Sequence, residues 1–120
     1  MDAQATMRLM FDTMDAYDRS DFDRLGEIYA KEAVWKNSEP AGPHCQNRED
    51  IFDMFRGRME SGIRVTFDEL RSTPTQVLVA ARAPDFDSAF SVFTFEGRRI
   101  VHVADYDSME AAEAARRVPT

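Results

Sequence analysis

Hydrophobic residues recur every three or four positions in three segments of the first half of the chain, which predicts three amphipathic helices. The first helix spans residues 2–19. The second follows Ser20, which we predict to be its N-cap, with Asp23 completing a capping box. The third begins after Asn47 and ends near Glu60, before Ser61-Gly62. The apolar positions of the first helix are Ala3, Met7, Met10, Phe11, Met14 and Tyr17, those of the second are Phe22, Leu25, Ile28 and Tyr29, and those of the third are Ile51, Met54, Phe55 and Met59.

In the second half of the chain the period changes from 3.6 to 2, the alternation typical of β-strands. Four strands are predicted, at Arg64 to Leu70, Gln76 to Ala83, Ala89 to Phe95 and Arg98 to Tyr106. A short earlier strand, Ala33 to Asn37, places Trp35 and Asn37 on one face, and residues 38–46 are predicted to form a loop. Asp107 is the expected cap of a closing helix from Ser108 to Arg117.

Helices that precede a run of strands with short connections predict an α+β domain with antiparallel neighbouring strands. The helices cover one face of this sheet. Aromatic and β-branched residues occupy both parities of the strands, as Phe90 and Phe93 illustrate. The outer face therefore also needs a cover, and we expect a homodimer formed through it.

The length of 120 residues and a hydrophobic fraction of 43% fit a single domain, residues 1–120, with a real core. The net charge of −7 disfavours nucleic acid as a partner. No apolar run reaches the roughly 20 residues of a membrane span, and no secretory signal pattern is present, so we expect a cytoplasmic protein. No metal-ligand spacing or nucleotide-binding glycine loop occurs, and we expect neither a metal nor another cofactor.

Two helices, a Trp-bearing strand, a third helix and paired strands that end in F-x-F-x-G-R-x-I-V-x-x-x-D-Y resemble the SnoaL-like proteins of the nuclear transport factor 2-like superfamily. The resemblance covers the chain from about Thr6 to Ala115. It implies a curved sheet that forms a cone, with the three N-terminal helices on its concave face. It also implies that a small, mostly apolar molecule binds inside the cone.

Asp105 is the candidate catalytic residue. In the SnoaL-type polyketide cyclases, an acid–base aspartate follows a G-R-I-V segment, and the resemblance places Asp105 at that aspartate. Alternation puts Asp105 on one face with Val101 and Val103, and burial beside apolar side chains would raise its pKa toward a range useful for proton transfer. Alternatively, Asp105 is a structural strand-end aspartate that is hydrogen-bonded to the turn or paired with an arginine such as Arg82.

The sequence does not match the ketosteroid isomerases of the same superfamily at their catalytic positions. Their general base falls on Asn37, their oxyanion-binding tyrosine on about Thr13, and their protonated acid on Ser91. We therefore expect a different mechanism here. Asn37 and Ser91 remain candidates for hydrogen bonds to a ligand. The other predicted ligand-binding residues, each of which could equally be part of the core, are Tyr17, Trp35, Phe55, Met59, Phe67, Phe93 and Val103.

The histidines and the single cysteine are weaker candidates. Strict alternation sends His102, beside Ile100, to the outer face. His44 and Cys45 are adjacent in the predicted loop, and a Cys-His nucleophile would need its base from elsewhere.

Three functions remain open from the sequence. The first is a cofactor-independent cyclase, isomerase or dehydratase that acts on a small hydrophobic carbonyl or hydroxyl compound with Asp105 as acid or base. The second is a non-catalytic binding module for a small apolar ligand. The third is a dimeric interaction subunit that works through its outer sheet face.

Overall fold

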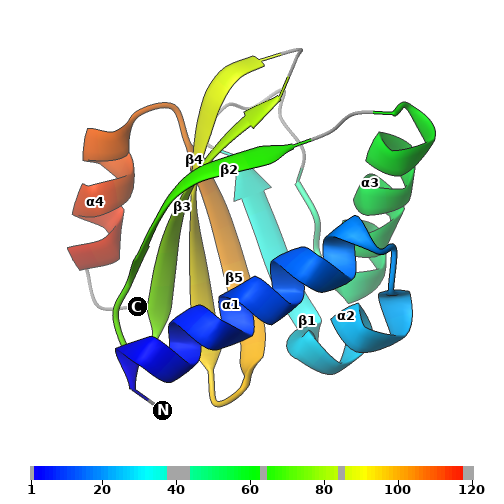
Figure 1. Cartoon of the computed structure of the whole chain (residues 1–120), viewed down its shortest axis with the longest axis horizontal. Coiled ribbons are helices and arrows are strands. Elements are labelled where there is room, and N and C mark those ends of the chain that lie inside the picture. The colour runs from blue at the N-terminus through cyan, green and yellow to red at the C-terminus, as the bar shows by residue number, and fades with distance from the viewer. Residues whose placement is uncertain (1, 38–43, 63–64, 84–85, 118–120) are drawn as a thin grey trace.

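The computed structural model of the chain describes residues 2–37, 44–62, 65–83 and 86–117, and it has an α+β architecture (Figure 1). Most of the predicted loop at 38–46 and the predicted strand start at Arg64 lie outside these residues. The elements are, in order, α1 (Ala3–Asp18), α2 (Phe22–Ile28), β1 (Tyr29–Asn37), α3 (Arg48–Glu60), β2 (Thr66–Ser72), β3 (Gln76–Ala83), β4 (Phe86–Glu96), β5 (Arg99–Tyr106) and α4 (Met109–Arg117).

The strands form one curved sheet in the order β1-β5-β4-β3-β2. The short connections join antiparallel neighbours from β2 to β5, as predicted. The expectation of an entirely antiparallel sheet is wrong, however, because β1 pairs with β5 in parallel, with Trp35 opposite Val103. Since β1 is separated from β5 by α3 and three strands, no tight turn fixes their relative direction, and the sheet is mixed.

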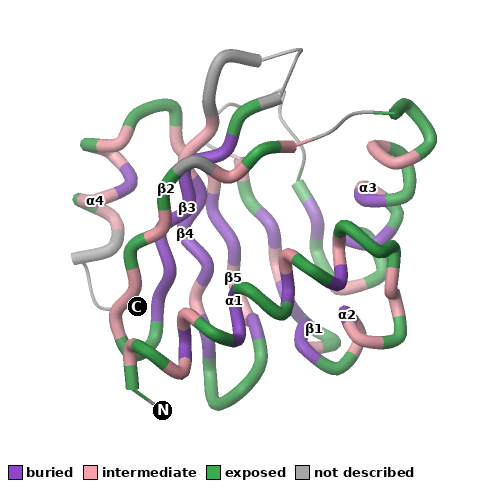
Figure 2. Tube along the Cα trace, viewed as in Figure 1, coloured by how far each residue is buried: buried purple, intermediate pink, exposed green. Residues whose placement is uncertain are grey.

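The two faces of the sheet are covered differently. Helices α1, α2 and α3 lie on the concave face, and they bury the main core against it (Figures 1 and 2). Helix α4 lies on the opposite face, where Ala112 packs with Leu78 and Val92. Part of the outer face is therefore covered by the chain's own last helix, and the homodimer stays a prediction.

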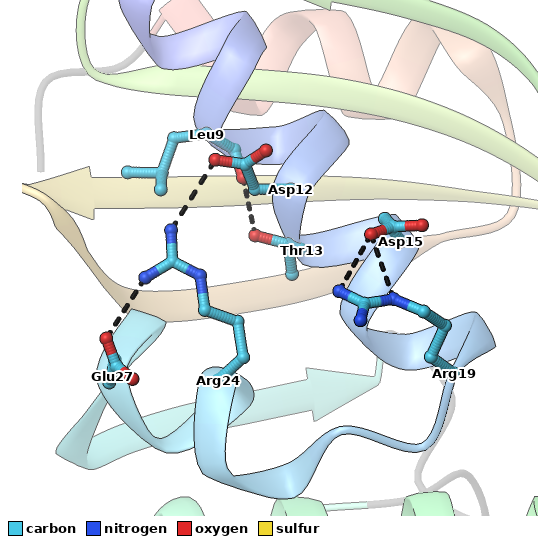
Figure 3. Close-up of polar contacts among 7 residues, drawn as sticks. All are labelled: Leu9, Asp12, Thr13, Asp15, Arg19, Arg24 and Glu27. Atoms are coloured by element: carbon cyan, nitrogen blue, oxygen red, sulfur yellow. Dashed lines mark hydrogen bonds and ion pairs between the residues drawn. The ribbon is translucent and has the colours of Figure 1, made fainter.

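The buried face of α1 differs from the predicted stripe. Phe11 is 52% exposed, whereas Thr6 and Thr13 are buried. Both threonine hydroxyls donate to main-chain carbonyls, that of Thr13 to Leu9 O at 2.7 Å (Figure 3). These hydrogen bonds let a threonine occupy an apolar interface without an unsatisfied polar atom. A prediction from hydrophobicity alone therefore assigns some wrong residues to the buried face of α1.

Charged side chains join the outer surfaces of α1 and α2. Arg24 on α2 lies 3.5 Å from the Asp12 carboxylate on α1 and 3.2 Å from Glu27 on its own helix (Figure 3). Arg19 pairs with Asp15 at 2.9 Å. All are at least 36% exposed, and such surface pairs each contribute no more than about 1 kcal/mol.

The Asn47 cap of α3 is confirmed, because its side chain accepts a hydrogen bond from the backbone N–H of Asp50 at 2.9 Å. Two other predicted caps are wrong by one residue. Asp21, not Ser20, caps α2, and the oxygen that accepts from Ala111 N belongs to Ser108 rather than to Asp107. Where two capping residues are adjacent, the path of the incoming chain decides between them.

One residue of β5 shifts the alternation of the sheet. The register with β4 runs from Phe95–Ile100 to Thr94–His102, so Val101 is an extra residue without a partner. Strict alternation placed Ile100 on the outer face, but this bulge turns it into the main core beside Val103. Strand β1 is also longer than predicted, because it begins at Tyr29 rather than at Ala33. Tyr29, predicted as an apolar position of the second helix, therefore belongs to the strand.

No helix among the described residues is long and apolar enough to cross a membrane.

Gly97 and Gly57 provide a matched test of the backbone. Gly97 has φ of +61° in the turn between β4 and β5, so Gly97→Ala should cost about 1 kcal/mol of unfolding free energy. Gly57 lies within α3 with open space around it, and Gly57→Ala should stabilise by up to about 1 kcal/mol. Urea unfolding measures both, and equal effects would contradict the turn conformation.

Candidate functional site

A cavity of about 80 Å³ lies between the concave face of the sheet and the helices α1 and α3. It has room for about five water molecules, the size of a compact organic group. Carbon atoms make up most of its wall. The lining residues come from α1, α3, all five strands and the segment before β2, and are Met10, Thr13, Met14, Tyr17, Tyr29, Trp35, Phe55, Arg58, Val65, Phe67, Val79, Ala81, Ala89, Ser91, Phe93 and Asp105.

Asp105 is the one acidic side chain of this lining, and two neighbouring strands fix its carboxylate. The indole Nε1–H of Trp35 on β1 donates to Oδ2 at 2.7 Å. The hydroxyl of Ser91 on β4 donates to Oδ1 at 2.6 Å. Because β5 lies between β1 and β4, all three side chains project from adjacent strands onto the same concave face. Each carboxylate oxygen keeps further acceptor capacity beyond its one hydrogen bond.

Burial raises the pKa of Asp105 above its ordinary value. The hydrogen bonds from Ser91 and Trp35 and the positive charge of Arg58 act in the opposite direction, but they do not cancel the loss of hydration. The cavity therefore holds a carboxyl group that takes up and releases a proton more readily near neutral pH than an exposed aspartate does.

Aromatic rings and a backbone bridge hold Trp35 in place. Its ring packs edge-on against Phe55 at 5.8 Å and Phe93 at 5.7 Å between centroids. Its backbone exchanges two hydrogen bonds with Cys45, at 3.0 and 2.8 Å. The indole is 5% exposed, so its N–H has few alternatives to the carboxylate. The rigid indole in turn orients Asp105.

Tyr17 and Arg58 supply the polar groups of the helical side of the cavity. The Tyr17 hydroxyl is buried and has no hydrogen-bond partner of good geometry among the described residues. Burial raises the pKa of Tyr17, although the nearby Arg58 guanidinium favours the tyrosinate. The guanidinium of Arg58 lies 5.9 Å from the centre of the Trp35 ring. This side of the cavity thus presents a hydroxyl and a neighbouring cation, which interact but make no hydrogen bond of good geometry.

Most of the predicted site residues line this one cavity, namely Tyr17, Trp35, Phe55, Phe67, Ser91, Phe93 and Asp105. Val103 is not part of the lining, and its side chain packs within the main core. Met59 packs against the outside of that core, with its sulfur 3.4 Å from the Ser20 hydroxyl. Asn37 is also outside the lining, at the end of β1, although its backbone pairs with that of Asp105.

Arg58 is the functional candidate that the sequence analysis missed. It lies seven residues after Ile51 and three after Phe55, so it continues their helical stripe into the last turn of α3. The apolar pattern instead selected Met59, one position further on. A charged residue in register with an apolar stripe is the signal that could have identified Arg58.

The histidines and Cys45 lie outside the cavity. His102 is partly buried away from it, and burial together with Lys36 lowers the pKa of His102. Cys45 is buried, which raises the pKa of its thiol. Within the described residues, no group of three or more His, Cys, Asp or Glu side chains could hold a metal ion.

The profile of the SnoaL-like domain matches residues 10–105, which are most of the chain. The chain belongs to the SnoaL-like domain family. The match ends at Asp105, so the matched region contains the whole Trp35–Ser91–Asp105 arrangement. No sequence among the curated proteins matches this SnoaL-like domain significantly.

Solved structures share the fold of this SnoaL-like domain at low sequence identity. Bal32a, from a soil-derived mobile gene cassette, is 19% identical with a TM-score of 0.74, over 87% of this chain and 89% of that one. The candidate polyketide cyclase SMa1630 of Sinorhizobium meliloti is 21% identical with a TM-score of 0.69, over 82% and 94%. IdmH of Streptomyces antibioticus, also a candidate polyketide cyclase, is 16% identical with a TM-score of 0.67, over 92% and 96%.

Asp105→Asn should stabilise the domain at neutral pH. The raised pKa means that the folded state binds the proton of Asp105 more tightly than the unfolded state does. The contribution of Asp105 is therefore complete below about pH 4, the pKa in the unfolded chain, and is lost as pH rises through the folded-state pKa. Asparagine keeps an acceptor for Trp35 without a charge to desolvate. Urea unfolding across a pH series should show an advantage of the variant that grows with pH, and an advantage that shrinks would contradict this.

Tyr17→Phe should raise the free energy of unfolding by about 1 kcal/mol, because it removes a buried hydroxyl without a hydrogen-bond partner. Thermal and urea unfolding of the two proteins without ligand give the difference. A loss of similar size would show instead that the hydroxyl has a stabilising partner in the folded state.

Proposed function

We propose that this SnoaL-like domain catalyses a proton transfer on a small hydrophobic carbonyl or hydroxyl compound, with Asp105 as the acid–base group. Ring closure, isomerisation and elimination of water are the reactions that such a step serves. The observation that carries the proposal is a partly buried carboxyl group, aimed into a mostly apolar cavity and hydrogen-bonded on both oxygens.

The hydrogen bonds of Asp105 support a role in proton transfer. Trp35 and Ser91 hold the carboxylate in one orientation, which removes the entropy cost of orienting it against a substrate. The remaining lone pairs can accept a proton from a carbon or oxygen atom in the cavity. Once Asp105 is protonated, the same group can return the proton to another atom of the substrate.

The cavity supports a small apolar substrate. Its wall is built from aromatic, methionine and aliphatic side chains, which bind nonpolar groups through burial of apolar surface. Methionines at positions 10 and 14 adapt readily to the shape of a ligand. The candidate polyketide cyclases among the structural neighbours, SMa1630 and IdmH, are consistent with this class of compound.

Hydrogen–deuterium exchange at carbon tests the proposal without knowledge of the natural substrate. Aryl ketones such as acetophenone and 2-tetralone are incubated with the protein in D₂O, and the NMR signal of the protons next to the carbonyl is followed. The wild-type protein should accelerate the loss of this signal. Asp105→Asn should lower the acceleration by about 100-fold or more, the contribution of a general base.

A matched control is Asp53→Asn, since Asp53 is an exposed carboxylate on α3 that pairs with Arg56 away from the cavity. With this variant, the protons next to the carbonyl of the ketones should exchange for deuterium at the wild-type rate. Exchange that is equally fast in Asp105→Asn would overturn the proposed role. Binding of the ketones without accelerated exchange in the wild-type protein would favour a non-catalytic binding module.

The pH dependence should follow from the pKa of Asp105. The deprotonated carboxylate is the base, so the exchange rate should rise with pH through the raised pKa and then level off. The hydrogen bond from Ser91 lowers this pKa, and Ser91→Ala should therefore move the rise to higher pH. Rate measurements from acid to neutral pH on both proteins check the direction, and an unmoved or lowered midpoint would contradict it.

A further inference from the structure

Within the part of the chain that the structure describes, the cation of the cavity has no carboxylate at ion-pair distance. Arginines 19, 24, 56 and 71 each lie within 4 Å of a carboxylate, whereas Arg58 has no such partner among the described residues. Arg58 is partly buried at the end of α3, with its guanidinium against the Trp35 ring. A guanidinium that is partly removed from water and unpaired attracts an anion more strongly than one at an open surface.

Asp105 does not fill the role of that counter-ion. Its two oxygens accept from Trp35 and Ser91, and its distance from Arg58 exceeds that of an ion pair. The positive charge of Arg58 lowers the pKa values of Asp105, Tyr17 and Tyr29, three groups that line the cavity with it. The cavity thus has an acidic side on the sheet and a cationic side on the helices.

Tyr17 provides a second donor on the cationic side. Its hydroxyl is buried, lacks a partner of good geometry, and belongs to the same lining as Arg58. The ring of Tyr17 is held edge-on against Phe55 at 4.9 Å, one turn of α3 before Arg58. A ligand oxygen placed between them would satisfy the hydroxyl and neutralise the guanidinium together.

We infer that Arg58 and Tyr17 form a carboxylate-binding subsite, so that the ligand of this cavity is a compact apolar molecule that carries one carboxylate group. The planar guanidinium can donate two parallel hydrogen bonds to a carboxylate, and the tyrosine hydroxyl can donate a third. The inference rests on the proposed function, because it names the substrate class of the same cavity. Bound at this subsite, the carboxylate would turn the apolar and reacting part of the molecule toward Asp105.

Matched pairs of acids and amides test the subsite. The pairs are benzoate with benzamide, phenylacetate with phenylacetamide, and hexanoate with hexanamide, and calorimetry at neutral pH gives their affinities. The wild-type protein should bind at least one acid about tenfold or more tightly than its amide. Because the net charge of the chain is −7, a preference for an anion must come from a local cation.

Variants of two arginines on α3 identify the source of the preference. Arg58→Gln should bring the acids down to the affinity of the amides, and it should weaken the amides far less than the acids, because they lose no ionic attraction. Arg58→Lys should keep part of the preference, since it retains the charge but not the planar pair of donors. Arg56→Gln is the control, because Arg56 is exposed, pairs with Asp53 and stacks on Phe22. It should bind both series like the wild type. Tyr17→Phe should weaken the acids severalfold and the amides less, because a hydrogen bond to a charged acceptor is the stronger one.

The outcomes distinguish a failure of the carboxylate subsite from a failure of the proposed function. Equal affinities for acids and amides in the wild type, or a preference that survives in Arg58→Gln, would overturn the subsite and leave the proposed function standing. Absence of binding by every acid and amide of the panel, together with absence of ketone exchange, would overturn both.

Discussion

The hydrogen bond between the Trp35 indole and the Asp105 carboxylate is the contact on which the site depends. It joins β1 to β5, residues 70 positions apart in the chain, at the edge where the sheet changes from antiparallel to parallel pairing. This hydrogen bond satisfies a buried polar group on each of the two side chains. It gives a buried indole N–H an acceptor, and it fixes one oxygen of a carboxyl group that burial would otherwise leave poorly solvated. Ser91 on β4 donates a hydrogen bond to the other oxygen. Hydrogen bonds from the two neighbouring strands therefore offset part of the desolvation free energy of the carboxyl group on β5.

The curvature of the sheet explains why this carboxyl group faces a cavity rather than a packed core. Helix α1 crosses the concave face and α3 lies against β1 (Figure 1). The Trp35 ring makes edge-to-face contacts with Phe55 of α3 and with Phe93 of β4. All three rings line the cavity, and these contacts hold its wall in place. On the outer face, by contrast, Ala112 of α4 packs directly onto Leu78 and Val92.

The site is polarised across the cavity. The sheet contributes an acid whose pKa is raised, and the helices contribute a cation and a buried hydroxyl, within a lining that is mostly apolar. Each of these few polar groups acts in surroundings of low dielectric constant, which strengthens its electrostatic effect within the cavity. The fold alone does not specify that chemistry, and the side chains at a few positions of the cavity do.

The sequence by itself determined the α+β class, most of the helices and strands, and the side of the sheet on which Asp105 and Trp35 lie. These features follow from local periodicity and turn residues, which act over a few positions of the chain. Only the tertiary structure decided the rest. The parallel pairing of β1, the bulge at Val101 that turns Ile100 inward, and the entry of Arg58 into the cavity in place of Met59 each depend on contacts between segments far apart in the chain. A local sequence pattern does not predict those contacts, because the packing free energy that favours them is gained only when the helices pack on the curved sheet.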